Sequence, residues 1–238
     1  MAQIEQSALR NRILTALPSA DFKRLAASLT SVTLTLKQNL LEAEEPIGAA
    51  YFIETGMISY LNYLEGGEAQ EIGLIGSEGM IGLPLILGVD QAPFGAMVQM
   101  EGTALRLSPT ALRQAFNESE TLRTRLLRYM QALHIQVSQT AACNNHHSLE
   151  ERLTRWLLMA HDRAGDDRFP MTHEFMSMML GVRRAGVTVT AGALKNAGLI
   201  HYTNGHITVL DRPSLEAMAC ECYGNVQRQF DQLLGAGA

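Results

Sequence analysis

Apolar and polar residues alternate over short segments in the first half of the chain, as in Val32-Thr33-Leu34-Thr35-Leu36. Glycines separate these segments at short intervals. Many short alternating segments with regular glycine turns are typical of an antiparallel barrel or sandwich. We therefore predict an antiparallel, jelly-roll-like barrel or sandwich within residues 13–108. A short helix is predicted over residues 20–25, with Ser19 as its N-cap.

The spacing becomes helical after Ser108-Pro109, where a proline in the first turn favours the start of a helix. A short helix is predicted over residues 110–116, and residues 118–145 follow without glycine or proline. Within this second segment, the 4-3-4-3 spacing of a coiled-coil seam relates Leu126, Met130, Leu133, Val137 and Thr140.

A long helix with one narrow apolar stripe needs another surface to cover that stripe. We predict homodimerisation through Leu126, Met130, Leu133 and Val137. Because periodicity alone does not identify the partner, packing of the stripe on the chain's own barrel is the alternative. The sequence Asn-Asn-His-His at residues 144–147 is predicted to interrupt the helix and to form a hinge.

A further helix is predicted over residues 148–161, because Ser148 and Glu151 have the spacing of a capping box. Two shorter helices should follow it. Thr172 is expected to cap the first, and Gly181 to make the turn between them, since glycine enters left-handed backbone space at little cost. Gly198 is expected to end the second helix.

Residues 199–210 have the pattern of a β-hairpin with an Asn204-Gly205 turn. Helix, turn, helix and hairpin together are the layout of a winged helix-turn-helix. The segment Gly186-Val187-Thr188-Val189-Thr190 has local strand propensity, but its surroundings favour a helix. Such a helix would be stabilised mainly by inward packing of Val187 and Leu194.

The predicted fold class is α+β, with three parts along the chain. Residues 1–117 should form the domain that contains the antiparallel, jelly-roll-like sheet. Residues 118–147 should form the dimerisation helix and the hinge. Residues 148–238 should form the winged helix-turn-helix domain with a C-terminal helix.

Several motifs resemble those of the Crp/Fnr family of bacterial transcription regulators. They are Gly79-Met80-Ile81-Gly82 in the barrel, Leu180-Gly181-Val182-Arg183-Arg184, and Lys195-Asn196-Ala197-Gly198-Leu199-Ile200. The resemblance spans nearly the full chain. It implies a β-roll sensor domain, a dimerising helix, and a winged domain whose helix from Val182 onward enters the major groove of DNA.

The resemblance and the exposed positions expected for this helix give a set of candidate DNA contacts: Thr172, His173, Arg183, Arg184, Ala185, Thr188, Val189 and Lys195. Arg184 matches an arginine of the family pattern, and its bidentate contact with a guanine edge is worth about 1–3 kcal/mol of discrimination. Ala185 and Val189 stand where well-known members have a glutamate and a second arginine. These two side chains are suited to thymine methyl groups, so the operator should differ from the family's usual one.

The formal net charge of −5 argues at first against nucleic-acid binding. DNA, however, meets only the docked face of a protein. Residues 172–205 contain Arg183, Arg184 and Lys195 against Glu174 alone, which gives a local charge of +2. We therefore expect modest non-specific affinity and strong sensitivity to salt.

The barrel departs from the family members that bind cyclic AMP. Those members carry a Gly-Glu-Leu motif and a later Arg-Ser pair, whereas here Gly82 precedes Leu83-Pro84, and residues 92–96 contain no arginine. A phosphate needs a cationic partner or a nest of amides, so the usual mode of cyclic AMP binding is not expected. We expect an unknown small-molecule effector in a pocket that involves Gly79, Ile81, Gly82, Leu83 and Phe94.

No cofactor or metal site is predicted. No cysteine precedes Cys143, and the barrel has neither cysteine nor histidine, which argues against the iron–sulfur and haem sites of the family. His146 and His147 are expected to be solvated. Cys220 and Cys222 flank Glu221 in the predicted C-terminal helix, where two thiols at this spacing diverge by about 200°, so a shared metal is not expected there. Three reduced, structural thiols are the expectation.

The absence of several motifs limits the class of function. No signal peptide or apolar stretch of about 20 residues is present, so a cytoplasmic protein without membrane contact is expected. No phosphate loop, nucleophile elbow or zinc-protease motif occurs, which argues against an enzyme. The expected partners are double-stranded DNA and a second copy, with RNA polymerase as a further candidate. The alternative is a ligand-binding or adaptor module whose helix-turn-helix no longer binds DNA.

Overall fold

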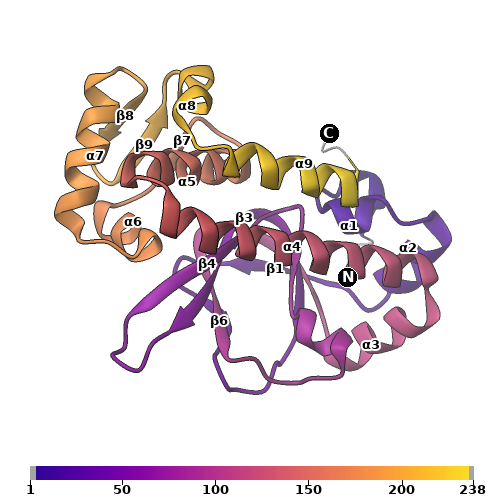
Figure 1. The fold of residues 1–238 in the computed structure, drawn as a ribbon. Helices are drawn as coiled ribbons and strands as arrows, with labels where there is room; N and C mark the ends of the chain where they lie inside the picture. Colours follow the sequence, from indigo (N-terminus) through magenta and orange to yellow (C-terminus); the bar gives the residue numbers. More distant parts are fainter. Residues whose placement is uncertain (1–3, 236–238) are drawn as a thin grey trace.

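The structure is a computed structural model that describes residues 4–235 (Figure 1). An antiparallel sheet forms the N-terminal part, long helices cross it, and a small winged domain follows (Figure 1). The predicted α+β class is therefore confirmed. Within the described residues, no helix is both long and apolar enough to cross a membrane.

The N-terminal part contains short helices and one six-stranded sheet. Its elements are η1 (Gln6–Ala8), α1 (Arg12–Thr15), α2 (Ser19–Ala26), β1 (Thr30–Leu34), β2 (Asn39–Leu41), β3 (Ala50–Tyr63), β4 (Ala69–Ile75), β5 (Met80–Ile81), η2 (Leu83–Leu87) and β6 (Phe94–Leu107). The main strand order is β1-β6-β3-β4, with β2 paired to β6 and β5 to β3, all antiparallel. Register shifts between Ile53 and Ile58 interrupt the long β3–β6 pairing, and such shifts bend and twist a sheet.

The predicted N-cap of the second helix is wrong. Ser19 is the first helical residue of α2, and Pro18 takes the N-cap position without a side-chain hydrogen bond. Helix α3 (Pro109–Glu118), by contrast, begins as the Ser108-Pro109 signal predicts. The Ser108 hydroxyl accepts a hydrogen bond from the backbone N–H of Ala111 at 3.2 Å.

Helix α4 (Glu120–His146) is fixed on the sheet by a tyrosine. Tyr129 is fully buried, and its hydroxyl donates a hydrogen bond to the carbonyl of Met80 at 3.2 Å. A Cβ atom at Gly79 would lie 2.2 Å from the Tyr129 hydroxyl. Only glycine therefore lets the ring reach the backbone of β5.

The predicted dimer seam on α4 needs correction. Leu126 is fully buried and Leu133 is only 7% exposed, both in the core that α4 shares with the roll. Met130 and Val137 are partly buried. Gln136 adds a polar contact on the same side, since its amide accepts from the N–H of Leu74 at 2.7 Å. The stripe is covered by the chain's own sheet, which is the alternative left open by its periodicity.

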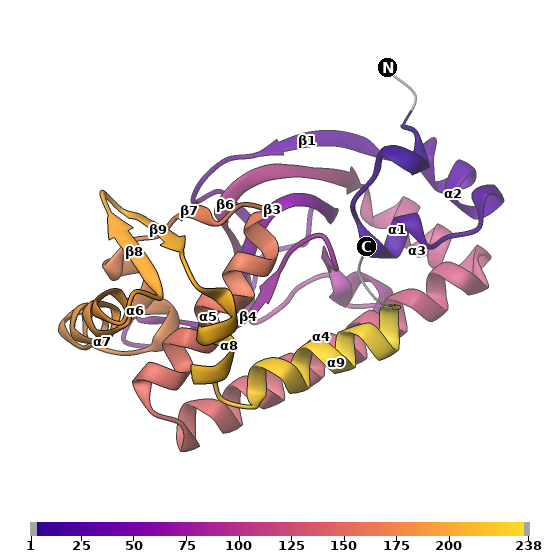
Figure 2. The same ribbon diagram turned by 90° about the horizontal axis from the view of Figure 1, so that it is seen from above.

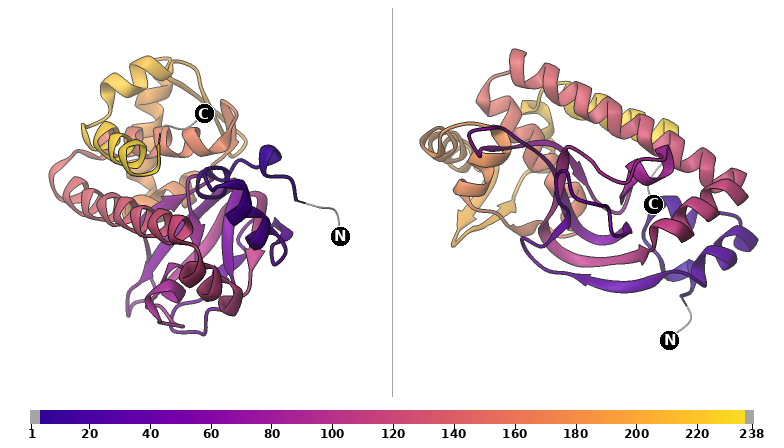
Figure 3. Two further views of the ribbon diagram at one scale, coloured as in Figure 1. Left: turned by 90° about the vertical axis from the view of Figure 1, so that its right-hand side faces the viewer. Right: turned by 90° about the horizontal axis from the view of Figure 1, so that it is seen from below.

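The last helix, α9 (Cys222–Leu234), covers a second side of α4. The two helices are antiparallel, because Arg125 contacts the carbonyl of Leu234 and Gln139 contacts Cys222. Figure 2 and Figure 3 show them side by side along the roll. Val226 and Phe230 of α9 join the core cluster of the roll, as does Leu234.

The end of α4 differs slightly from the predicted hinge. Asn144 and Asn145 are helical, and α4 ends at His146 with His147 as its C-cap. The Asn145 amide donates to the carbonyl of Ala141 at 2.8 Å, so its polar side chain bonds within the helix instead of interrupting it. The change of direction lies at His147 and Ser148.

The C-terminal domain has the predicted winged layout, with one additional strand. Its elements are α5 (Leu149–Ala164), β7 (Arg168–Pro170), α6 (His173–Leu180), α7 (Arg184–Asn196), β8 (Ile200–Thr203), β9 (His206–Val209) and α8 (Arg212–Met218). The capping box of Ser148 and Glu151 is present. Asn204 and Gly205 have φ angles of 48° and 73° at the hairpin turn. The strand order β7-β9-β8 makes the wing three-stranded.

A buried polar contact joins the roll to the winged domain. Trp156 of α5 donates a hydrogen bond to the carboxylate of Glu71 on β4 at 2.7 Å, and Ser59 donates to the same carboxylate at 2.7 Å. Burial raises the pKa of Glu71 to about 7. Gln70 donates to the carbonyl of Met179 at 2.9 Å, so β4 contacts both α5 and α6.

Candidate functional site

Helices α6 and α7 form the expected helix-turn-helix. Thr172 caps α6, since its hydroxyl accepts from the N–H of Phe175 at 3.2 Å. Gly181 has a φ of 63° and ends the helix. Positive φ is costly for other residues, so this position explains how the chain turns sharply into α7.

Helix α7 includes the segment with strand propensity, as predicted from its surroundings. Val187 and Leu194 are fully buried, so tertiary packing outweighs local propensity here. At the other end, Gly198 has a φ of 76°, and Leu199 donates its N–H to the carbonyl of Leu194 at 3.1 Å. This is the glycine-containing helix end that the sequence predicts.

One face of α7 is open to solvent. Val189 is 74% exposed, so no other part of the chain covers its branched apolar side chain. The structure places further predicted DNA contacts on or beside this face, all exposed: Arg183, Arg184, Ala185, Thr188 and Lys195. The predicted set thus forms one surface, and the contact of that surface with DNA stays a prediction.

Arg184 lies at the start of this face with only a weak partner. Its guanidinium is 3.8 Å from the carboxylate of Glu174, and both side chains are largely exposed. Exposed pairs of this kind contribute between about 0 and 1 kcal/mol. The guanidinium is therefore available to an external acceptor at small cost.

His173 occupies a less open position than expected. Its ring stacks on Tyr202 of the wing, with the centroids 4.2 Å apart, and its Nδ1 lies 3.1 Å from the hydroxyl of Thr188. Burial lowers the pKa of His173, and the charge of Arg184 lowers it further. His173 therefore connects α6, α7 and the wing. Tyr202 was not among the predicted site residues, because the stacking depends on the folded wing.

The predicted effector pocket is filled by side chains. Ile81 and Leu83 are buried core residues, and Tyr129 occupies the space beside Gly79. A Cβ atom at Gly82 would lie 3.1 Å from the Cα atom of Ala50. Phe94 packs against Tyr60 with a centroid distance of 5.1 Å. A ligand at these residues would have to displace packed groups.

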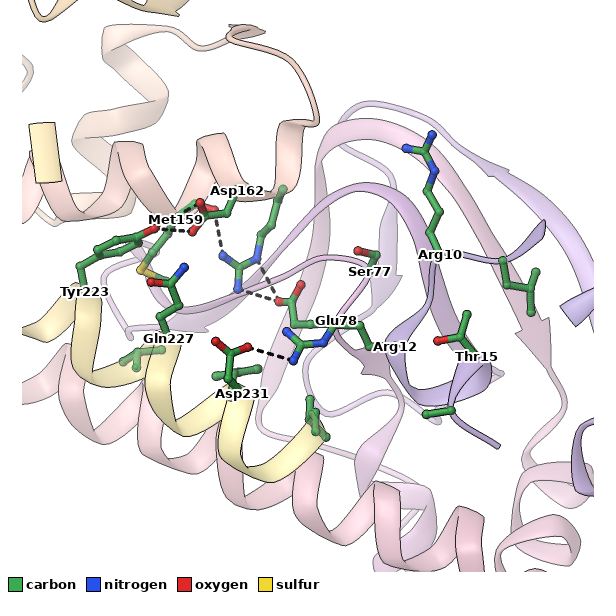
Figure 4. A pocket seen from close by; sticks show the side chains of 16 residues that line it. Arg10, Arg12, Thr15, Ser77, Glu78, Met159, Asp162, Tyr223, Gln227 and Asp231 are labelled. Atoms are coloured by element: carbon green, nitrogen blue, oxygen red, sulfur yellow. Dashed lines mark hydrogen bonds and ion pairs between the residues drawn. The ribbon is translucent and has the colours of Figure 1, made fainter. Parts of the chain in front are cut away.

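A cleft of about 880 Å³ lies elsewhere, between the N-terminal segment, the turn before β5, α5 and α9 (Figure 4). Four of the charged side chains on its walls form two ion pairs. Arg163 lies 2.6 Å from Glu78, and Arg12 lies 3.1 Å from Asp231 (Figure 4). No pattern in the sequence indicates this cleft, because its walls come from four distant segments.

A cluster of potential metal ligands lies at residues for which the sequence predicts no metal site. Donor atoms of Cys143, His147, Cys220 and Cys222 all lie within 4.8 Å of one another. Cys220 precedes α9, whereas Cys222 is its first residue. The argument that two helical thiols diverge therefore does not apply. Burial raises the pKa of Cys143 and that of Cys220, the latter to about 12.

Comparisons with known proteins identify two domains. Residues 32–119 match the family model of the cyclic nucleotide-binding domain. Residues 151–218 match that of the Crp-like helix-turn-helix domain. The first match covers most of the sheet and α3, and the second covers most of α5 and continues through α8. A comparison with curated proteins found no match.

Solved structures share the fold at low sequence identity. FixK2 from Bradyrhizobium japonicum has a TM-score of 0.70 and 15% identity, over 81% of this chain and 98% of its own. A Crp/Fnr-family regulator from Eubacterium rectale has a TM-score of 0.68 and 17% identity, over 87% and 96%. A Crp/Fnr-family regulator from Thermus thermophilus has a TM-score of 0.66 and 20% identity, over 80% and 98%.

These likenesses agree with the motifs around Gly79 and Gly181 and with the exposed face of α7. The two domain families occur in the order expected of a sensor domain followed by a DNA-binding domain. This chain belongs to the Crp/Fnr family of transcription regulators.

Proposed function

We propose that the chain acts as a homodimer that binds a pseudo-palindromic site in double-stranded DNA through α7. The observation that carries this proposal is the open face of α7, where Arg184 has only a weak partner and Val189 is uncovered. Arg184 would contact a guanine edge in the major groove. Ala185 and Val189 would contact thymine methyl groups.

The other predicted contacts would position the domain on the phosphate backbone. Arg183 and Lys195 are exposed cations on the helix-turn-helix. Thr172 and His173 lie at the start of α6, where backbone N–H groups attract phosphate. Phosphate contacts set the register, whereas base contacts set the sequence preference. The slope of affinity against salt scales with the number of phosphates neutralised, so these few cations should give modest affinity and a moderate dependence on salt instead of the strong one expected from the sequence.

The dimer is proposed to form on the side of α4 that neither the roll nor α9 covers. Leu127 is 41% exposed there, and Gln131, His134 and Ser138 are exposed at the same 4-3-4 spacing. This seam is shifted by one residue from the predicted one. Pairing along it would place two α7 helices about 34–36 Å apart, one turn of DNA.

Regulation is proposed to depend on a small molecule other than cyclic AMP bound in the usual mode. Residues 79–96 include neither lysine nor arginine, and a bound cyclic phosphate needs a cation or an amide nest. An effector at the roll would act by shifting it against α4, because Tyr129 connects the two. Such a shift would alter the spacing of the α7 helices and hence the affinity for DNA.

Fluorescence anisotropy with labelled duplexes from the region upstream of the chain's own gene tests this proposal. The assay should be run at two salt concentrations against a scrambled duplex of equal length. Preference for one duplex, lost in a variant of Arg184, is expected. Equal affinity for every duplex would overturn the proposal and favour the adaptor module that does not read DNA.

A further inference from the structure

Four potential metal ligands converge where α4 ends and α9 begins. Cys143 lies in the last turn of α4, and His147 is its C-cap. Cys220 lies between α8 and α9, and Cys222 begins α9. The Sγ atoms of Cys143 and Cys220 are 3.5 Å apart, and the Sγ atom of Cys222 is 3.5 Å from Nδ1 of His147.

These separations suit a single tetrahedral ion. Zinc binds thiolate sulfur at about 2.3 Å and imidazole nitrogen at about 2.0–2.1 Å. Two donors of one tetrahedral zinc ion are therefore about 3.4–3.8 Å apart, close to the two distances of 3.5 Å in the structure. All donor atoms fall within 4.8 Å of one another. A cluster with each thiolate on a different iron atom needs sulfurs farther apart.

The surroundings of the four ligands also resemble those of a metal site. His147 directs Nδ1 toward the thiols, while its Nε2 lies 3.3 Å from the carboxylate of Glu221. A carboxylate on the outer nitrogen is the usual partner of a metal-bound histidine, because it fixes the tautomer and the orientation of the ring. The Gln139 amide donates to the Sγ atom of Cys222 at 3.0 Å.

A buried cation stands near the same thiols. Arg155 is only 5% exposed, and its charge favours the thiolate form of Cys143. Its Nε atom has no hydrogen-bond partner among the residues that the structure describes. Three thiolates and one divalent ion carry a net charge of −1, so a buried guanidinium would balance this centre.

We propose that Cys143, His147, Cys220 and Cys222 bind one zinc ion in a tetrahedral Cys3His site. Each thiol loses its proton to solvent as its sulfur binds the metal, so three protons are released and no electron is transferred. The ion joins the end of α4 to the start of α9. Because Ser148 directly follows His147 and caps α5, the site also fixes the direction in which the winged domain leaves α4.

A disulfide between Cys143 and Cys220 is the competing use of two of these thiols. It requires an oxidant, and it leaves the convergence of Cys222 and His147 unexplained. It also gives no role to the contact between His147 and Glu221. The four-ligand arrangement therefore favours the metal over the disulfide.

The first test measures metal in the full-length protein, purified with a reducing agent after growth with added zinc. Mass spectrometry of the metal content should give about one zinc per chain. Titration of the metal-free protein with Co²⁺ should give the intense visible bands of a tetrahedral site and a thiolate-to-cobalt charge-transfer band. Less than one tenth of an ion per chain, together with an octahedral cobalt spectrum, would overturn the proposal.

Matched variants then test the ligands. His147→Ala should lose most of the bound zinc, whereas His146→Ala should keep it, because the adjacent His146 is exposed and outside the cluster. Cys222→Ser should weaken the charge-transfer band. Glu221→Gln should lower the zinc affinity by about 10- to 100-fold, measured by competition with a chromophoric chelator.

Two further results would count against the site. One is equal loss of zinc in His146→Ala and His147→Ala at unchanged helical content by circular dichroism. The other is a Cys143–Cys220 disulfide in wild-type protein without metal, detected by peptide mapping after alkylation without reduction. The wild-type zinc content and cobalt spectrum do not depend on the folding of any variant.

Discussion

The indole of Trp156 and the carboxylate of Glu71 form a 2.7 Å hydrogen bond across the boundary between the winged domain and the roll. Glu71 is only 6% exposed. Burial raises its pKa to about 7, although Ser59 and Trp156 both donate to it and favour the charged form. The contact between the two domains therefore contains a carboxyl group that changes charge near neutral pH.

Stability should fall as the pH rises from about 4.5 to about 7. In this range the unfolded chain has lost the proton of Glu71 and the folded chain retains it, so folding becomes less favourable. The change is on the order of 3 kcal/mol. Urea unfolding at pH 5 and pH 8 should show this loss in the wild type and a much smaller one in Glu71→Gln.

Glu68→Gln is the control for this experiment, because Glu68 is an exposed carboxyl on the turn before β4. Its unfolding should keep the pH dependence of the wild type. The assignment to Glu71 would be wrong if Glu71→Gln and the wild type lost the same free energy between the two pH values.

Arg184→Ala should weaken binding to the operator more than binding to unrelated DNA. A bidentate contact with guanine contributes about 1–3 kcal/mol of discrimination, whereas phosphate contacts act on all sequences alike. Lys195→Ala provides the comparison, with a similar loss on both duplexes. Anisotropy at fixed salt measures both variants, and equal losses for Arg184→Ala would exclude base contact.

Leu127→Glu should convert the proposed dimer into monomers. It places a charge on the exposed side of α4 proposed to meet a second copy, without entering the core. Leu87→Glu, at an exposed position on η2, should leave the dimer intact. Analytical ultracentrifugation gives the mass of each variant. A Leu127→Glu chain that still sediments as a dimer would rule out this side of α4.

Leu126→Ala should reduce stability without a specific effect on dimerisation. Leu126 is fully buried within the chain, and removal of such a side chain costs about 2–5 kcal/mol. The decrease in the midpoint temperature of thermal unfolding, relative to the wild type, should be the same at low and high protein concentration. A decrease that becomes larger on dilution would instead indicate that Leu126 belongs to the dimer seam.

Features specified by local sequence were predictable. The capping box at Ser148, the glycine turn at Gly181 and the Asn204-Gly205 hairpin depend on residues only a few positions apart, and all are present. The exposed face of α7 could be predicted because Gly181, Gly198 and the hairpin define where this helix begins and ends. Its helical state could be inferred even though the segment from Gly186 to Thr190 has strand propensity.

Features that depend on distant packing were not predictable in the same way. Leu126 and Leu127 differ by one position, yet on a helix this rotates the side chain by about 100°, from the roll to solvent. The Cys3His cluster requires that Cys143 meet Cys220, which lies 77 residues later. No local pattern shows that α9 returns to α4. The third strand of the wing, β7, also depends on pairing with a distant strand.

The return of α9 along α4 restricts how the winged domain can move. The domain is attached at its beginning by the α4–α5 junction and at its end by the segment that leads into α9. Arg12 and Asp231 secure the far end of α9 to the N-terminal segment. A simple swing about one pivot would strain the second attachment. Reorientation of α7 therefore requires α9 to slide along α4 or to detach from it, so each change of state needs breakage of an extended apolar contact.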